Sequence, residues 1–188
     1  MGNLYTSIRT LQIRLADAGV PSIVIGGVAV GVWGDPRVTR DADLKVLLER
    51  EDADRLLAIL EPGYDSLLPD PKEAVRRQAM LFVQDADNTR LDLLLADTPY
   101  DVGAVARGCM IEVLPGVKIT VCSPEDLVIY KLISTRARDH EDASGVIRRQ
   151  GDALDVGYIL GWLRQFELAF DDSTLISTFQ RLLRGTRT

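Results

Sequence analysis

The sequence predicts a mixed α/β (α+β) fold with a short mixed sheet and a helical C-terminal region. Two observations carry this prediction. Short apolar runs rich in β-branched residues alternate with segments of helical spacing as far as Cys122. From Ser123 onward, apolar residues recur only at helical spacing. We therefore expect a core over residues 1–122 and a helical region over residues 123–188 that closes a cleft.

The N-terminal part of the core starts with a helix, a strand and a second helix. Apolar residues at helical spacing predict a helix over residues 4–18, which Gly19 ends. A β-branched run predicts a buried strand at 22–25, and Gly26-Gly27 breaks it before a short helix at 28–33. The same criteria predict, in order, a strand at 41–48, a helix at 53–60, strands at 79–83 and 90–95 around a polar turn, and a helix at 100–107.

A hairpin is expected at the end of the core. Pro115-Gly116 would join strands at 110–114 and 117–122. A two-residue turn places Cys109 opposite Cys122 as neighbouring reduced thiols, although Pro-Gly also favours a type II turn, which splays the strands and leaves the register open.

The helical region opens on a strong start signal. Ser123 is the expected N-cap, Pro124 the first helical residue, and Asp126 stands at the capping-box position. The helices expected from this point are 123–137, 140–149, 152–165 and 173–184.

Composition and charge narrow the functional classes. The apolar content of 46% and charged content of 27% are ordinary for a globular protein. The net charge of −6 argues against broad adhesion to nucleic acid, without excluding a local basic patch. His140 is the single histidine, which argues against histidine-based zinc or triad chemistry.

The sequence also predicts a cytoplasmic protein with no membrane segment. The N-terminus has no continuous apolar stretch typical of a secretory signal. The uncharged stretch 18–34 is short for a membrane span and is interrupted by Pro21, so a buried strand and helix explain it better. Two cysteines and no signal fit a reducing compartment.

The strongest chemical signal is Asp41-Ala42-Asp43-Leu44. Residues i and i+2 of a strand point to the same face, so Asp41 and Asp43 present two carboxylates side by side while Ala42 and Leu44 point into the core. Two carboxylates placed this close repel each other, and a bound Mg²⁺ ion, which prefers hard oxygen ligands, removes that repulsion. Asp41 and Asp43 are therefore predicted metal ligands.

Asp92 and the Gly26-Gly27 pair extend this candidate site. Asp92 stands alone in an apolar strand, where an acid is costly unless it is paired or ligates a metal. If its strand neighbours that of Asp41, three carboxylates meet, as a two-metal centre requires. The glycines let the backbone approach a phosphate, and the helix that follows would direct its N-terminal amides at that anion.

The set of motifs resembles the DNA polymerase β-like nucleotidyltransferase superfamily. Its pattern runs from an apolar residue and Gly-Gly or Gly-Ser, through a spacer, to Asp-x-Asp or Asp-x-Glu, with a third acid on a later strand. Here these pieces are Ile25-Gly26-Gly27, then Asp41-Ala42-Asp43-Leu44 after thirteen residues, and Leu91-Asp92-Leu93. The resemblance implies that Asp41, Asp43 and Asp92 are catalytic and bind Mg²⁺.

More narrowly, the chain resembles the branch that contains the abortive-infection type IV toxins. The residues that carry this likeness are Gly26-Gly27-x-Ala29, Gly34-x-x-Arg37-x-Thr39-x-Asp41-x-Asp43, Glu125-Asp126-Leu127, Lys131-Leu132 and Arg136-x-x-Asp139-x-x-Asp142. The resemblance implies nucleotide-binding roles for Lys131 and Asp139, next to Gly26 and Gly27. Arg37 and Thr39 are further candidates, with packing and capping of the loop as the alternative.

The predicted activity is Mg²⁺-dependent transfer of a nucleoside monophosphate from an NTP such as ATP to an acceptor hydroxyl. The acceptor is either an RNA or tRNA end, as in a toxin–antitoxin system with a protein antitoxin, or a small molecule, as in aminoglycoside nucleotidyltransferases. A catalytically silent nucleotide-binding or regulatory module is the alternative of a different class. The oligomeric state stays open, with a homodimer among the alternatives.

Overall fold

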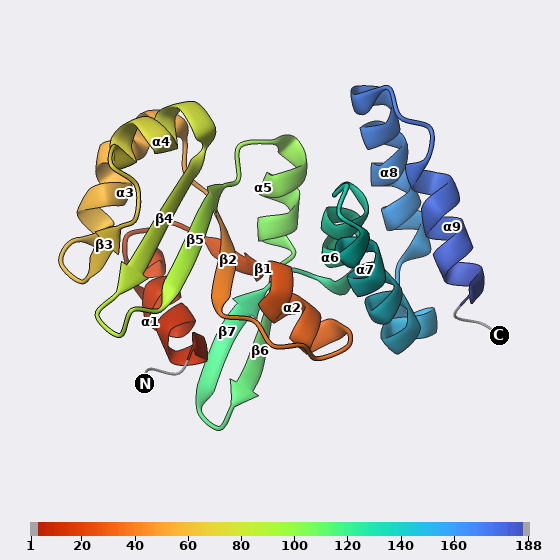
Figure 1. Cartoon of the computed structure of the whole chain (residues 1–188), viewed down its shortest axis with the longest axis horizontal. Helices are drawn as coiled ribbons and strands as arrows, with labels where there is room; N and C mark the ends of the chain where they lie inside the picture. The colour runs from red at the N-terminus through yellow and green to blue at the C-terminus, as the bar shows by residue number, and fades with distance from the viewer. Residues whose placement is uncertain (1–3, 186–188) are drawn as a thin grey trace. The chain divides into compact units, whose positions relative to one another are not determined.

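The computed structural model describes residues 4–185, which divide into two compact units (Figure 1). The sheet unit comprises the chain up to Val28 and residues 38–122. The helical unit comprises residues 29–37 and the chain from Ser123 onward. The boundary thus cuts through the second helix, so residues 29–37 group with helices that follow about ninety positions later. The predicted closing of a cleft by residues 123–188 stays a prediction.

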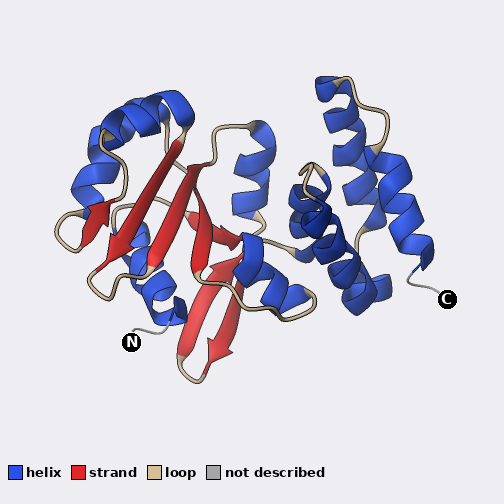
Figure 2. Ribbon diagram, in the orientation of Figure 1, coloured by secondary structure: helices blue, strands red, loops and turns tan. Residues whose placement is uncertain are grey.

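The strands all lie in the sheet unit, and the described part of the helical unit contains only helices and loops (Figure 2). The elements of the sheet unit are α1 (Leu4–Asp17), β1 (Ser22–Ile25), the start of α2 (Gly26–Trp33), β2 (Asp41–Val46), η1 (Arg50–Asp52), α3 (Ala53–Leu60), β3 (Tyr64–Ser66), α4 (Pro71–Gln78), β4 (Met80–Asp85), β5 (Arg90–Leu95), α5 (Pro99–Ala106), β6 (Cys109–Leu114) and β7 (Val117–Val121).

Within residues 4–185 the strands form one mixed sheet of seven, in the order β3-β4-β5-β2-β1-β7-β6. The β2–β5 and β1–β7 pairs are parallel, and the other pairs are antiparallel. Strand β2 therefore lies in the middle of the sheet, between β1 and β5. This position brings residues from widely separated parts of the sequence next to the Asp41-x-Asp43 motif.

Helix α1 covers part of the sheet. It packs against β1, β2 and β7 and fully buries Ile8, Leu11 and Leu15, which recur at the spacing of one helical face. Helices α3 and α4 pack against each other, and α4 also contacts β4 (Figure 1). The buried side chains of β2 are Ala42, Leu44 and Val46. The polar residues of β2 consequently lie on its other face.

The helical unit contains the end of α2 together with α6 (Pro124–Leu132), α7 (Ala137–Gln150), η2 (Gly151–Ala153), α8 (Val156–Phe170) and α9 (Leu175–Gly185). Two side chains of α7 tie the end of α2 to this unit: Arg149 donates to the Gly34 carbonyl at 2.6 Å, and Gln150 donates to the Trp33 carbonyl at 2.7 Å. No helix in residues 4–185 has the length and apolar character needed to cross a membrane.

Several boundary predictions in this region were wrong, and α8 spans Val156–Phe170 rather than 152–165. Helix α6 ends at Leu132 rather than at 137, and α7 begins at Ala137 rather than at 140. Strand β3 and helix α4 were not predicted from the sequence. The start of α4 carries a recognisable cap, because the Asp70 carboxylate accepts a hydrogen bond from the Glu73 amide and Pro71 fills the first helical position.

The hairpin of β6 and β7 has a different register from the predicted one. Leu114 pairs with Val117 as a two-residue turn requires, but Cys109 pairs with Val121 instead of Cys122. An irregularity between Glu112 and Leu114 places one extra residue in β6, which shifts the earlier pairs by one. Neither Cys109 nor Cys122 is part of a disulfide bond, and Cys122 is buried.

Candidate functional site

Asp41 and Asp43 lie on the polar face of β2. Burial alternates strictly along the strand, with Ala42 and Leu44 fully buried and the two aspartates half-buried. This pattern confirms the predicted alternation. Lys45 continues the same row, and its ammonium lies 2.9 Å from a carboxylate oxygen of Asp101 at the start of α5. The lysine is therefore paired with an acid outside the Asp41-x-Asp43 motif.

The parallel register of β2 and β5 places Asp92 beside this pair. Asp43 and Asp92 are direct partners across the two strands, and Asp41 is the partner of Arg90. Partners across a ladder point to the same face, so Asp41, Asp43 and Asp92 share the polar face of the sheet. Asp92 is buried. The proximity that the metal hypothesis requires between these two strands is thus present.

Gly26 meets Asp43 where β1 leads into α2. A Cβ atom at Gly26 would lie 1.9 Å from Oδ2 of Asp43, and the glycine has a φ of +63°. Both the left-handed backbone and the contact with the carboxylate require glycine at this position. Helix α2 starts at this residue rather than at Val28, so the Gly26-Gly27 pair forms the N-terminus of the helix.

Thr39 supports Asp41 from the loop before β2. The Thr39 hydroxyl lies 3.2 Å from both the carboxylate Oδ1 and the backbone carbonyl of Asp41. It can donate its proton to either oxygen, and in both cases it fixes the start of the strand. Thr39 therefore acts on the orientation of Asp41, which agrees with the capping alternative for this residue.

Arg90 is a residue that the sequence analysis missed. Its Nε and Nη2 atoms donate to Oδ1 and Oδ2 of Asp92 at 2.7 and 2.9 Å, a two-pronged ion pair. Its guanidinium also lies over the Phe82 ring, 4.9 Å from the ring centre. The hydrogen bonds to Asp92 raise the pKa of Arg90 above its ordinary value, burial acts against them, and the charges of Asp92, Asp41 and Asp43 add to the rise.

The donor chemistry of this face suits a divalent cation. Asp41, Asp43 and Asp92 offer only carboxylate oxygens, which are the ligands that Mg²⁺ prefers. Within the described residues, however, no three acidic, cysteine or histidine side chains converge closely enough to hold a metal ion in their present orientations. One of the three carboxylates, that of Asp92, is instead paired with Arg90.

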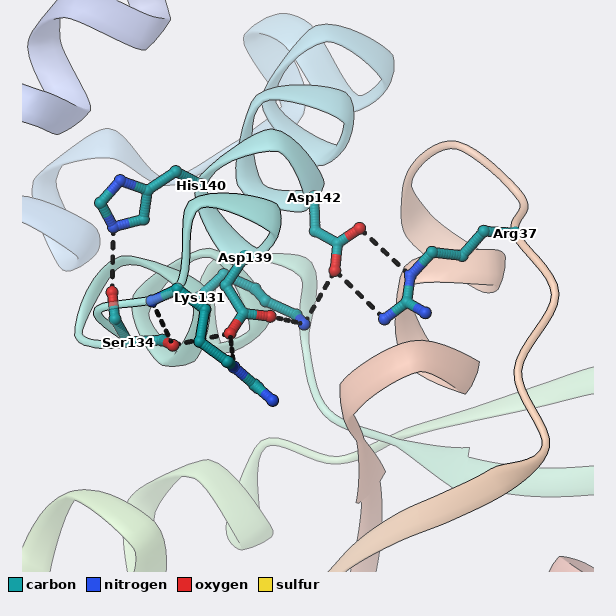
Figure 3. A network of polar contacts seen from close by, with 7 residues as sticks. Arg37, Lys131, Ser134, Asp139, His140 and Asp142 are labelled. Atoms are coloured by element: carbon teal, nitrogen blue, oxygen red, sulfur yellow. Dashed lines mark hydrogen bonds and ion pairs between the residues drawn. The ribbon is translucent and has the colours of Figure 1, made fainter.

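Lys131 lies in a separate network inside the helical unit (Figure 3). Its ammonium is 2.5 Å from Oδ1 of Asp139 and 2.9 Å from Oδ2 of Asp142, and the lysine side chain is only 6% exposed. One buried cation thus bridges two buried carboxylates of α7. These contacts join α6 to α7. They also neutralise the charge of Lys131, which was predicted to bind nucleotide phosphates.

Two arginines and a serine extend the network. The Arg37 guanidinium reaches Asp142 from the loop after α2, with Nη2 at 3.3 Å from Oδ2 and Nε at 3.2 Å from Oδ1 (Figure 3). The Nε contact is an ion pair without a hydrogen bond. Ser134 donates to Oδ2 of Asp139 at 2.6 Å, and Arg136 donates to the same oxygen at 2.5 Å. Arg136 is 77% exposed, in contrast to Lys131.

The network shifts the titration of Asp139. Burial pushes the pKa of Asp139 upward, but the hydrogen bonds from Lys131, Ser134 and Arg136 and the charge of Lys131 outweigh it and lower the pKa from 3.8 to about 2. Asp139 is therefore ionised at neutral pH, and its charge is compensated within the helical unit.

The Glu125-Asp126-Leu127 motif also has a structural role. The Ser123 hydroxyl accepts a hydrogen bond from the Asp126 amide at 3.1 Å and lies 2.7 Å from the Asp126 carboxylate, which confirms the predicted cap. The Tyr158 hydroxyl of α8 donates to the other carboxylate oxygen of Asp126 at 2.7 Å. The motif thus joins the start of α6 to α8.

Comparison with known proteins shows the fold. No family model and no curated protein sequence matches the chain. An antigenic nucleotidyltransferase-like protein from Paracoccidioides brasiliensis has a similar structure, with a TM-score of 0.54 and 16% identity over 94% of this chain and 92% of that one. The antibiotic-resistance factor ANT(2'')-Ia has a TM-score of 0.56 and 17% identity over 89% and 94% of the two chains.

A third similar structure is the lincosamide antibiotic adenylyltransferase LnuA with bound lincomycin. Its TM-score is 0.50 and its identity 15%, over 75% of this chain and 94% of that one. The mixed sheet and C-terminal helices of this chain thus match the fold of these nucleotidyltransferase structures, and the predicted fold class is confirmed. The predicted toxin branch stays a prediction.

Proposed function

We propose that this chain is a Mg²⁺-dependent nucleotidyltransferase that moves a nucleoside monophosphate from an NTP to an acceptor hydroxyl. The observation that supports this most directly is the row of carboxylates from Asp41, Asp43 and Asp92 across β2 and β5. In a nucleotidyltransferase fold, three acids on one sheet face beside a glycine-opened helix match what phosphoryl transfer requires.

The three acids would bind the metal ions at different places. Asp41 and Asp43 would hold Mg²⁺ through their carboxylate oxygens, and Asp92 would hold the ion next to the acceptor. Bound Mg²⁺ supplies positive charge to the phosphate oxygens and favours deprotonation of the acceptor hydroxyl. Thr39 keeps Asp41 oriented, and Gly26 lets the Asp43 carboxylate lie against the backbone.

The transfer step conserves atoms and charge as follows. The acceptor oxygen forms a bond to the α-phosphorus of the NTP, and the bond from that phosphorus to the bridging oxygen breaks. Pyrophosphate leaves with the electron pair of the broken bond. The acceptor proton passes to the Asp92 carboxylate or to water, so Asp92 is both a ligand and a candidate base.

Gly26 and Gly27 would bind the triphosphate through the start of α2. The first amides of a helix have no partner within the helix and point at an anion placed there. The roles of Arg37, Lys131 and Asp139 in nucleotide binding stay predictions from the resemblance. Their contacts within the helical unit support a structural role, because each already takes part in the buried network.

Two acceptor classes have support of different kinds. The motifs from Gly34 to Asp43 and from Lys131 to Asp142 favour an RNA or tRNA end, as in the toxin branch, where a protein antitoxin would be a partner. The net charge of −6 favours a polycationic drug of the aminoglycoside class. The fold shared with ANT(2'')-Ia and LnuA is compatible with a small-molecule acceptor.

The test is label transfer from each of the four α-³²P-labelled NTPs. The full chain is incubated with Mg²⁺ and either total tRNA or a panel of aminoglycosides, and labelled products are separated. We expect labelled acceptor in one arm, none in EDTA, and none with Asp43→Asn, which keeps the shape of the side chain. Transfer that Asp43→Asn leaves unchanged would contradict the proposal, and NTP binding without any transfer would favour the silent module.

A further inference from the structure

Arg90 donates to both carboxylate oxygens of Asp92, which is one of the predicted metal ligands. The two hydrogen bonds to Asp92 measure 2.7 and 2.9 Å and match the fork of the guanidinium to the carboxylate. An oxygen that accepts such a bond has fewer lone pairs available for a cation. Asp92 must therefore lose at least part of this pair before it can ligate a metal ion.

The arginine is held in place from a second side. Phe82 of β4 is the register partner of Asp92, and its ring lies under the Arg90 guanidinium at 4.9 Å from the ring centre. The backbone of Arg90 is the partner of Asp41. The Arg90 guanidinium is thus held near the three acids by its position in β5, by the Phe82 ring and by the ion pair with Asp92. It remains 47% exposed, so it has room to move away.

The charges on this face explain why a cation is needed there. Asp41, Asp43 and Asp92 place three carboxylates on one face of the sheet, and Lys45 on the same row is already paired with Asp101. Arg90 supplies one positive charge to this group. A divalent cation at the same carboxylates would meet both the repulsion of Arg90 and the loss of its pair with Asp92.

We propose that Arg90 is a positioning residue that holds Asp92 when no divalent cation is bound and thereby sets the cation affinity of the carboxylate face. This inference rests on the metal site of the proposed function and adds a residue that competes with the cation. If the Arg90–Asp92 pair were only a structural contact at the surface, its removal would change stability slightly and leave the cation affinity unchanged.

The experiment measures Mn²⁺ binding to the full chain without nucleotide, by the electron paramagnetic resonance signal of free Mn²⁺. We expect Arg90→Met to bind Mn²⁺ about tenfold more tightly than the wild type, because it removes the competing charge and retains an unbranched apolar side chain. The matched control is Arg50→Met, which removes the same charge from an ion pair with Asp97 in the same unit. The control should bind Mn²⁺ as the wild type does.

Each result decides the inference. Tighter binding in Arg90→Met alone supports it, whereas binding equal to or weaker than the wild type overturns it and leaves the metal site intact. If neither the wild type nor any variant binds Mn²⁺ while circular dichroism shows folded protein, the metal site of the proposed function fails as well. If Arg90→Met does not fold, Arg90→Lys replaces it, with severalfold tighter binding expected and unchanged binding contradicting the inference.

Discussion

The carboxylate of Asp43 lies where a side chain on Gly26 would have to be. A Cβ at Gly26 would approach Oδ2 of Asp43 to 1.9 Å, closer than two non-bonded heavy atoms can come. The residue that opens α2 and the acid in the centre of the sheet therefore depend on each other. This contact links the two halves of the candidate site, the start of the helix and the carboxylate row.

The first prediction concerns Gly26→Ala. The variant should unfold about 1–3 kcal/mol more easily than the wild type, because its backbone must keep a φ of +63° and the Asp43 carboxylate must move. It should also weaken Mn²⁺ binding. Urea denaturation and a Mn²⁺ titration check the two effects.

Gly31→Ala is the control for this prediction, since it lies in the same helix with no atom within 4 Å of the added Cβ. It should leave stability unchanged or raise it by up to about 1 kcal/mol. Equal stability and equal Mn²⁺ affinity in the two variants would contradict the dependence of Asp43 on Gly26.

The alternation of the β2 residues could be predicted from sequence, because the side chains of a strand point to its two faces in turn. The pairing of Asp43 with Asp92 could not, since it depends on which distant strand lies beside β2. Arg90 carried a usable signal: in Arg90-Leu91-Asp92 the two charged residues share a face of the strand, where they can pair.

The second prediction concerns Lys131→Met. The substitution leaves Asp139 and Asp142 buried without their shared counter-ion, which should cost about 3–5 kcal/mol in the free energy of unfolding. The exposed pair of Arg148 with Asp35 provides the comparison, and Arg148→Met should change stability by less than about 1 kcal/mol. Similar losses in the two variants, measured by urea denaturation, would show that the Lys131 network is not a stabilising element.

The third prediction concerns acid. The pKa of Asp139 is about 2 in the folded chain against an ordinary 3.8, so the unfolded chain takes up this proton first as the pH falls. The contribution of Asp139 to the free energy of unfolding is therefore complete above about pH 5. About 2 kcal/mol of it should be lost as the pH falls from about 4 to 2.

Urea denaturation of the wild type and Asp139→Asn at several pH values between 7 and 2 checks this. The stability difference between the two proteins should be constant from pH 7 to pH 5 and shrink by about 2 kcal/mol below that range. A difference that stays constant down to pH 2 would mean that Asp139 titrates alike in the folded and unfolded chains.

Capping residues in the local sequence mark the starts of α6 and α4. The Ser123-Pro124 cap was found, and Asp70-Pro71 with Glu73 carries an equally readable cap for the missed α4. The register of the β6–β7 hairpin could not be predicted, because the extra residue between Glu112 and Leu114 has no glycine to mark it. The grouping of residues 29–37 with the C-terminal helices likewise depends on long-range contacts.

The most direct test of the central claim is the calorimetric titration of the full chain with each NTP, with Mg²⁺ and with EDTA. The account predicts NTP binding that requires Mg²⁺ and that Asp43→Asn abolishes or weakens at least tenfold, while Arg50→Met binds as the wild type does. NTP binding of equal affinity in EDTA, or in Asp43→Asn with Mg²⁺, would contradict a carboxylate-held metal site at Asp41, Asp43 and Asp92.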